Sequence, residues 1–335
     1  MHAKSLRKLS APRVIVIALL SIATVFVLAL SVTVWRAPLW VGAELTLFRL
    51  LAAGFHQRSL VINGYHIFYL EGGPSSGLPL VLIHGLNSKA QQDWVVLAPY
   101  LLRSGYHVYA LDLIGYGRSA KPLEFSYSIH DEAKLVESFL ATNHLTSVTL
   151  GGVSMGGWIA ATAALDRPDL VTRLMLFDSA GMKFQLGFDP AVFTPQTAQQ
   201  VDELMDVVSP NLPRVPQFVK ADYIRKNKRY GWVTLRALAS MSAGADDLDE
   251  KFSGLKMPLL IVWGKQDAMT PLLLGQSMHR AAPQSILAVY DGCGHIAVVT
   301  CGNAIASTVL NFLSGAGPQP GKTIEVPAHK HLLMP

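Results

Sequence analysis

One long apolar run near the N-terminus dominates the hydropathy pattern of the chain. Residues 14–34 carry no charged side chain and read VIVIALLSIATVFVLALSVTV. As a helix rising about 1.5 Å per residue, this run spans about 30 Å, the thickness of the hydrocarbon core of a bilayer. The apolar region of a cleaved signal peptide is shorter, at about 7–15 residues. We therefore favour an uncleaved transmembrane anchor, while Ala29-Leu30-Ser31 leaves signal-peptide cleavage open as the alternative.

The charges that flank this run predict its orientation. Residues 1–13 form a basic N-terminal tip with four Lys or Arg residues, whereas no acidic residue occurs before Glu44. Because the positive flank of a membrane helix stays in the cytoplasm, we expect a single-pass membrane protein with a cytoplasmic N-terminus. The body of the protein is then extracytoplasmic, which means periplasmic in a bacterium.

Residues 35–58 are predicted to form a juxtamembrane helix. Apolar side chains recur there in steps of three and four, at Val41, Leu45, Phe48, Leu51 and Phe55. This spacing is helical, and Trp40 would suit a membrane interface. The pattern leaves two interpretations open, which are a helix on the membrane surface and an ordinary helix packed on the body.

Beyond residue 58, short apolar runs alternate with helical patterns. Asn63-Gly64 separates two of these runs and supplies the residues of a tight hairpin turn. Six further runs are predicted as buried strands, at residues 80–83, 107–113, 148–153, 174–177, 259–263 and 286–290. Such alternation is typical of a mostly parallel sheet with helices on both faces. We therefore predict an α/β core formed by residues 59–178 and 257–314.

Two segments depart from this alternation. Residues 179–256 contain five prolines and no apolar run of strand type, which predicts an inserted helical cap. Residues 315–335 contain Gly, Pro and Lys without an apolar period, and we expect them to form a disordered tail.

Net charge argues against one class of partner. The chain has a formal charge of +5, and the five basic residues before position 37 account for all of it. A neutral body with a basic tip does not suit a nucleic-acid partner. The two cysteines, Cys293 and Cys301, are too few for a multi-cysteine metal site. We expect them to be packed free thiols rather than a disulfide.

The motif Gly152-Val153-Ser154-Met155-Gly156 carries the strongest chemical signal in the chain. This G-x-S-x-G pattern follows a predicted strand and opens an alanine-rich helix, which is the setting of a nucleophile elbow. In such a tight turn the serine hydroxyl is exposed, and the flanking positions have no room for a side chain. The sequence therefore predicts Ser154 as a nucleophile.

A serine nucleophile needs a base, and the base needs a third group that orients it. His295 follows the last predicted strand of the core, and Asp267 follows the strand before it. These residues complete the chain order Ser, acid, His. Asp178 is a rival acid at the end of an earlier strand, but chain order favours Asp267. The backbone N–H groups of Leu86 and Met155 are the predicted oxyanion hole.

Together these motifs resemble the α/β-hydrolase superfamily. The resemblance rests on His84-Gly85, Asp112 to Ser119, Gly152 to Gly157, Trp263 to Asp267 and Cys293 to His295. The N-terminal anchor and three cap segments resemble the membrane-anchored monoacylglycerol lipases of the α/β-hydrolase-domain group. These cap segments are Ser179 to Met182, Phe193 to Pro195 and Pro213 to Gln217. The resemblance implies a serine esterase that cleaves acylglycerols or similar lipid esters, with Ser154, Asp267 and His295 as its triad. No metal or organic cofactor is implied.

Two other functions stay open. Meta-cleavage C–C bond hydrolases resemble this chain at the elbow. They usually carry a tryptophan after the catalytic histidine and Gly-Pro-Gly near the oxyanion loop, where this chain has Ile296 and Asn87-Ser88. The second alternative is a non-catalytic ligand-binding protein, because a fold does not fix a function. For a lipid ester, the cap offers an apolar set to line an acyl-chain site: Phe184, Leu186, Phe188, Phe193, Phe218, Val219 and Tyr223.

Overall fold

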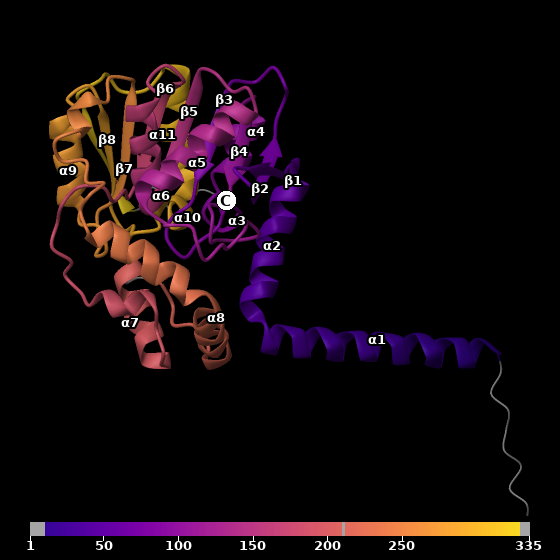
Figure 1. Ribbon diagram of the computed structural model, residues 1–335. Coiled ribbons are helices and arrows are strands. Elements are labelled where there is room, and N and C mark those ends of the chain that lie inside the picture. Colours follow the sequence, from indigo (N-terminus) through magenta and orange to yellow (C-terminus); the bar gives the residue numbers. More distant parts are fainter. Residues whose placement is uncertain (1–10, 210–211, 329–335) are drawn as a thin grey trace, which may run out of the picture.

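The computed structural model describes residues 11–209 and 212–328 (Figure 1). Within these residues, nine strands form one sheet in the order β1-β2-β4-β3-β5-β6-β7-β8-β9. The strands are β1 (Phe55–Ile62), β2 (Tyr65–Gly72), β3 (Pro79–Ile83), β4 (His107–Leu111), β5 (Val148–Val153), β6 (Val171–Phe177), β7 (Leu259–Gly264), β8 (Ile286–Tyr290) and β9 (Thr323–Val326). β2 runs antiparallel to both of its neighbours, and every other pairing is parallel. The prediction of a mostly parallel sheet is confirmed.

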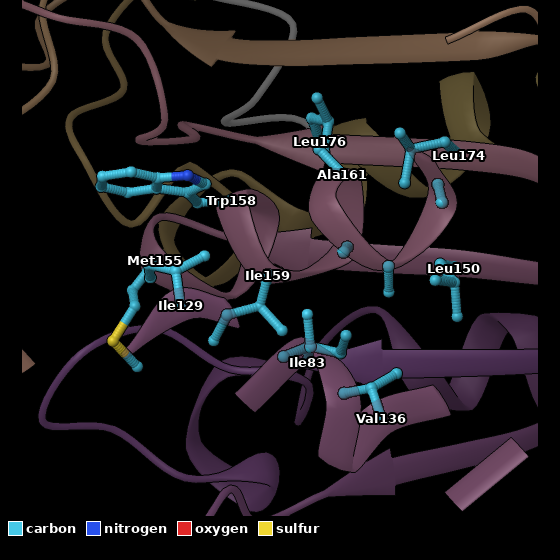
Figure 2. Packing of buried hydrophobic residues seen from close by; sticks show 14 of the residues in the cluster. Ile83, Ile129, Val136, Leu150, Met155, Trp158, Ile159, Ala161, Leu174 and Leu176 are labelled. Carbon is cyan, nitrogen blue, oxygen red and sulfur yellow. The ribbon is translucent and has the colours of Figure 1, made fainter. Parts of the chain in front are cut away.

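Helices cover both faces of this sheet. One face packs against α5 (Ile129–Thr142), α6 (Met155–Asp166) and α9 (Leu272–Ala281). The other packs against α2 (Pro38–Ala52), α3 (Ala90–Asp93), α4 (Ala98–Arg103), α10 (Ala297–Thr300) and α11 (Gly302–Ser314). Successive residues of a strand point to opposite faces, so Ile83 joins the first layer and Leu82 the second. Figure 2 shows Ile159 of α6 lying close to Ile83 within the first layer.

The chain between β6 and β7 contributes helices rather than strands. Its described residues form the short 3-10 helices η1 (Pro190–Phe193) and η2 (Phe252–Gly254), and the α-helices α7 (Ala198–Val208) and α8 (Gln217–Ser242). The Thr197 hydroxyl caps α7 by accepting a hydrogen bond from the Gln200 backbone N–H, and the Gln200 side chain bonds back to the Thr197 N–H. In Figure 1, α7 and α8 stand at one end of the sheet.

Helix α1 (Ala11–Arg36) projects away from the body (Figure 1). Its part from Ile15 to Arg36 is long and apolar enough to cross a membrane, with a mean hydropathy of 2.9 and no burial against the body. A signal sequence would satisfy the same two criteria. The helix includes the whole of the apolar run at residues 14–34. Residues 1–10 of the predicted basic tip lie outside the described residues.

The juxtamembrane helix is shorter than the sequence predicts. Helix α2 ends at Ala52, and Gly54, with a φ of 104°, turns the chain into β1. Phe55 was expected on the helix but lies in the strand, where it is paired with Gly72 of β2. Phe55 leaves the helix despite its helical spacing, because in β1 it completes the hydrogen-bonded ladder with β2.

Helix α2 has two apolar faces, and only one of them contacts the body. Leu47 and Leu50 are buried in the core, whereas Trp40, Leu45 and Phe48 are exposed. Leu45 and Phe48 belong to the set whose spacing identified the helix, and Trp40 is the residue that would suit a membrane interface. The body therefore leaves the outward apolar face of α2 uncovered.

The C-terminal segment contains a strand where the sequence predicts a disordered tail over residues 315–335. Strand β9 pairs in parallel with β8, and the Leu287 N–H donates to the Lys322 carbonyl at 3.0 Å. The prediction was wrong for these residues because a four-residue edge strand has too short a pattern to detect. Pairing satisfies backbone groups of β8 that would otherwise form an open edge. Residues 329–335 lie outside the described residues.

The two cysteines form a disulfide, so the expectation of free thiols was wrong. Cys293 and Cys301 lie on either side of the single turn of α10, which brings their Cα atoms to 6.3 Å. This separation lies in the range that a disulfide spans. The bond encloses the loop that carries His295.

We expect removal of this disulfide to lower stability. The double variant Cys293→Ala, Cys301→Ala should lose about 2.5 kcal/mol of unfolding free energy, because the unfolded chain regains the entropy of an eight-residue loop. Urea denaturation of the full chain in detergent measures the loss. Reduction of the unmodified chain with dithiothreitol serves as the matched control. It should give the same denaturation midpoint as the double variant. An unchanged midpoint in both would show that the disulfide does not stabilise the fold.

Candidate active site

Ser154 lies at the sharp turn between β5 and α6. Its φ of 55° falls in the left-handed region that residues other than glycine rarely adopt. The adjacent glycines allow this turn. A Cβ on Gly152 would lie 2.1 Å from the Gly156 carbonyl oxygen, and a Cβ on Gly156 would lie 2.4 Å from the carbonyl oxygens of Ile83 and His84. The motif therefore forms the strand–turn–helix arrangement that the sequence predicts.

His295 links Ser154 to Asp267. Its Nε2 lies 2.9 Å from the Ser154 Oγ, and its Nδ1 lies 2.9 Å from Asp267 Oδ2. The side chains of His295 and Asp267 are 5% and 0% exposed. The structure thus brings Ser154 together with His295, 141 positions later in the chain, and with Asp267, in a geometry suited to proton transfer from Ser154.

The Asp267 carboxylate is held by three donors from its own loop. Its Oδ1 accepts hydrogen bonds from the backbone N–H groups of Met269 and Thr270, each at 2.8 Å. The Thr270 hydroxyl lies 2.7 Å from Oδ2 and 3.0 Å from His295 Nδ1. Sequence reasoning missed Thr270, because a threonine three positions after an aspartate is not a distinctive signal.

The rival acid, Asp178, has a different role in the structure. It is fully buried, and its two oxygens accept hydrogen bonds from the N–H groups of Gly264 at 2.7 Å and Ala297 at 3.1 Å. Burial, together with the neighbouring Asp267, raises the pKa of Asp178 well above its usual range. Asp178 therefore ties the end of β7 to the start of α10, and its described hydrogen bonds do not include His295.

The loop after β3 carries Leu86 beside the elbow, and a buried carboxylate shapes it. Asp93 accepts a hydrogen bond from the Gly85 N–H at 2.9 Å and another from the Ser88 hydroxyl at 2.5 Å. His84 is fully buried, and its Nε2 accepts a hydrogen bond from the Leu113 N–H at 3.0 Å. His84 is thus a structural residue of this loop. Asp93 was not identified from the sequence.

An apolar cavity of about 240 Å³ opens at Ser154. We call it the apolar cavity; its lining includes Leu86, Trp158, Met182, Phe184, Leu186, Phe193, Leu238, Met241 and Met269. Three members of the predicted apolar set are therefore in place. Phe188 packs against Phe193 with ring centroids 5.8 Å apart. Phe218, Val219 and Tyr223 do not line this cavity.

The part of the chain that the structure describes contains no metal centre near Ser154, His295 and Asp267. Among those residues, His, Cys, Asp and Glu side chains form no group of three or more that could hold a metal ion.

Comparison with known families places this geometry in a fold class. Residues 79–232 match the family described as alpha/beta hydrolase fold, and residues 238–323 match the family described as TAP-like protein. The chain therefore has the α/β-hydrolase fold, as its motifs predict.

The similar proteins include some that are named lipases and some that are named hydrolases of dienoic acids. Lipase 1 of Psychrobacter immobilis is 27% identical over 266 residues, which cover 75% of this chain and 80% of the relative. The 2-hydroxy-6-oxo-6-(2'-aminophenyl)hexa-2,4-dienoic acid hydrolase of Metapseudomonas resinovorans is 27% identical over 277 residues, which cover 78% of this chain and 92% of the relative. Among solved structures, a bacterial membrane phospholipase A described as a virulence factor is similar, with a TM-score of 0.76 and 27% identity. The match covers 88% of this chain and 98% of the phospholipase chain.

Proposed function

We propose that this protein is a membrane-anchored serine hydrolase that cleaves carboxylic esters of lipids, of the monoacylglycerol lipase type. One observation carries the proposal. His295 contacts both Ser154 and Asp267, at 2.9 Å each, and Ser154 lines the apolar cavity. The names of Lipase 1 and of the membrane phospholipase A support a lipid ester as the substrate class.

The proposed reaction is a two-step acyl transfer. His295 takes the proton of Ser154 as the serine oxygen attacks the ester carbonyl, and Asp267 holds the imidazole in the required tautomer. The N–H groups of Leu86 and Met155 stabilise the negative charge that develops on the carbonyl oxygen. His295 then protonates the departing alcohol. A water molecule, deprotonated by His295, finally releases the fatty acid from Ser154.

We also propose that α1 is retained as a membrane anchor, with the N-terminus cytoplasmic and the body on the other side. The exposed apolar surface of α1 and its continuation into α2 support an anchor. The Cys293–Cys301 disulfide supports the extracytoplasmic location, because disulfides persist in oxidising compartments.

A C–C bond hydrolase of the meta-cleavage type is the second candidate. The relative from Metapseudomonas resinovorans has such a name and covers a similar share of this chain. The two reactions use the same kind of nucleophile and base, so the substrate assay must separate them. Hydrolysis of a ring-cleavage dienoate at a rate above that of a medium-chain ester would favour this candidate.

Replacement of Ser154 tests the serine-hydrolase proposal directly. We expect Ser154→Ala to abolish both ester hydrolysis and labelling by a fluorophosphonate probe, because only residual catalysis survives loss of the nucleophile. Ser242→Ala is a matched control, since Ser242 lines the same cavity without contacting His295. Turnover of Ser154→Ala within about tenfold of the unmodified protein would refute the proposal.

The two buried aspartates should respond differently to the same change. We expect Asp267→Asn to lower kcat by about 10⁴-fold, because an amide favours the wrong histidine tautomer. Asp178→Asn should instead act mainly on stability, since its hydrogen bonds go to the backbone N–H groups of Gly264 and Ala297. Ester hydrolysis and urea denaturation, measured on both variants, separate the two roles. A larger loss of kcat in Asp178→Asn would reverse the assignment of the acid.

Acyl chain length should control the rate. Each buried methylene contributes about 0.8 kcal/mol, so four added carbons should raise kcat/KM by up to about 200-fold before the apolar cavity is filled. A series of monoacylglycerols and p-nitrophenyl esters in detergent micelles measures this profile. Phe184→Ala should weaken the dependence, whereas Phe218→Ala should not, because only Phe184 lines the cavity. If kcat/KM did not change with acyl chain length, the protein would be a general carboxylesterase rather than a lipase.

A further inference from the structure

A second cavity, of about 160 Å³, lies on the other side of the loop that follows β3. Three separate segments line it, which are residues 87–89, residues 115–121 and the part of α8 between Tyr223 and Thr234. Each segment contributes one lysine to the lining: Lys89, Lys121 and Lys226. We call this space the lysine cavity. It brings together three cationic side chains that the sequence separates by 32 and 105 positions.

Within the described residues, no carboxylate forms an ion pair with the three lysines of the cavity. Within the described residues, neither Lys89 nor Lys226 forms an ion pair, and the Lys121 ammonium donates only to backbone carbonyls, at 2.9 Å to Gly117 and 3.0 Å to Ser119. The Lys121 Nζ also lies 5.6 Å from the ring centroid of Tyr230. Lysine ammonium groups that share a cavity without a carboxylate repel one another, and an anion relieves this repulsion.

The nearest acidic side chains are engaged elsewhere. Asp112 accepts hydrogen bonds from the backbone N–H groups of Ala90 and Arg118, both at 2.8 Å. Glu44 forms an ion pair with the Arg118 guanidinium at 2.9 Å. Asp222 accepts from Arg225 at 3.1 Å and from the Leu39 N–H at 3.1 Å. None of these carboxylates can turn into the cavity without losing a partner.

The lysines also influence one another's titration. Burial, followed by repulsion from Lys226, lowers the pKa of Lys89 to about 8. Burial lowers the pKa of Lys121 as well; the Asp112 carboxylate opposes this shift, and Lys226 adds to it. Lys226 therefore acts on both of the other lysines, which agrees with their shared position around one cavity.

The lysine cavity lies beside the junction of the candidate membrane helix with the body. The Arg225 side chain on α8 donates to the Arg36 carbonyl at the end of α1, at 2.6 Å. Asp222 on α8 accepts from the N–H of Leu39 at the start of α2. Lys226 and Tyr223 are adjacent to these two residues in the same helix. In Figure 1, α8 and α2 lie on the side of the body from which α1 leaves it.

We propose that the lysine cavity binds the phosphate group of a membrane lipid, at a site separate from the apolar cavity. Lysine ammonium groups bind phosphate as point charges, and anionic headgroups concentrate at the surface of the bilayer. The side chain of Asn87 lies between the two sites. It donates to the carbonyl of Phe193, which lines the apolar cavity, and accepts from Thr234, which lines the lysine cavity. The site does not depend on the proposed ester hydrolysis.

Binding to a catalytically inactive full-length chain tests this site. Ser154→Ala in maltoside micelles excludes turnover, and the probes are dioctanoylphosphatidylglycerol, dioctanoylglycerol and free glycerol 3-phosphate. We expect calorimetry to show binding of the phospholipid, with an affinity at least about tenfold higher than that of dioctanoylglycerol. Lys89→Gln and Lys226→Gln, each added separately, should weaken binding of the phospholipid by about tenfold. Lys228→Gln is the matched control, because Lys228 lies on α8 outside the cavity lining.

Several results would overturn the proposal. Equal binding of dioctanoylglycerol would show that the acyl chains and not the phosphate are recognised. Equal loss in Lys228→Gln and Lys226→Gln would assign the effect to the general charge of α8. Free glycerol 3-phosphate binding as tightly as the lipid would replace the membrane lipid by a soluble phosphate ester. The unliganded melting temperature provides the folding control. It should not fall in Lys89→Gln or Lys226→Gln, since each change removes a repulsive charge, and a fall of several degrees would mark the lysine as structural.

Discussion

The close contact between the elbow and the end of β3 is the constraint on which the candidate site depends. Gly152 and Gly156 stand where a Cβ would lie 2.1 to 2.4 Å from backbone carbonyl oxygens. Only glycines permit helix α6 to begin so close to β3, and this approach accompanies the φ of 55° at Ser154. Because β3 and β5 are neighbours in the sheet, the same contact sets Leu86, in the loop after β3, beside the serine.

The order of the strands supplies the other members of the site. β6, β7 and β8 follow β5 across the sheet, so the loops at their carboxyl ends meet next to the elbow. The two buried carboxylates of this region have different hydrogen-bond partners. Asp267 contacts His295, whereas Asp178 accepts hydrogen bonds from Gly264 and Ala297 and so holds the two loops in place. The disulfide between Cys293 and Cys301 closes the loop that carries His295.

The loop that follows β3 lines both cavities. Leu86 lines the apolar cavity, and Lys89, three positions later, lines the lysine cavity. Asp93 holds the segment between them through the Gly85 N–H and the Ser88 hydroxyl. An anion bound beside Lys89 would therefore act on the same segment that carries a proposed oxyanion donor. The segment from Leu86 to Lys89 thus joins the two cavities through the backbone of one loop.

Features that depend on local pattern and chain order can be predicted from the sequence. The apolar run of α1, the strand–helix alternation and the elbow at Ser154 are visible because their periodicity, glycines and length lie within a few consecutive residues. The order Ser, acid, His was sufficient to prefer Asp267 as the partner of His295. Features that depend on distant partners become visible only once the chain is folded. Strand β9 needs the edge of β8, the disulfide needs the turn of α10, and the end of α2 follows the pairing of β1. The lysine cavity arises because three distant segments meet, and no pattern within one segment of a chain encodes such a meeting.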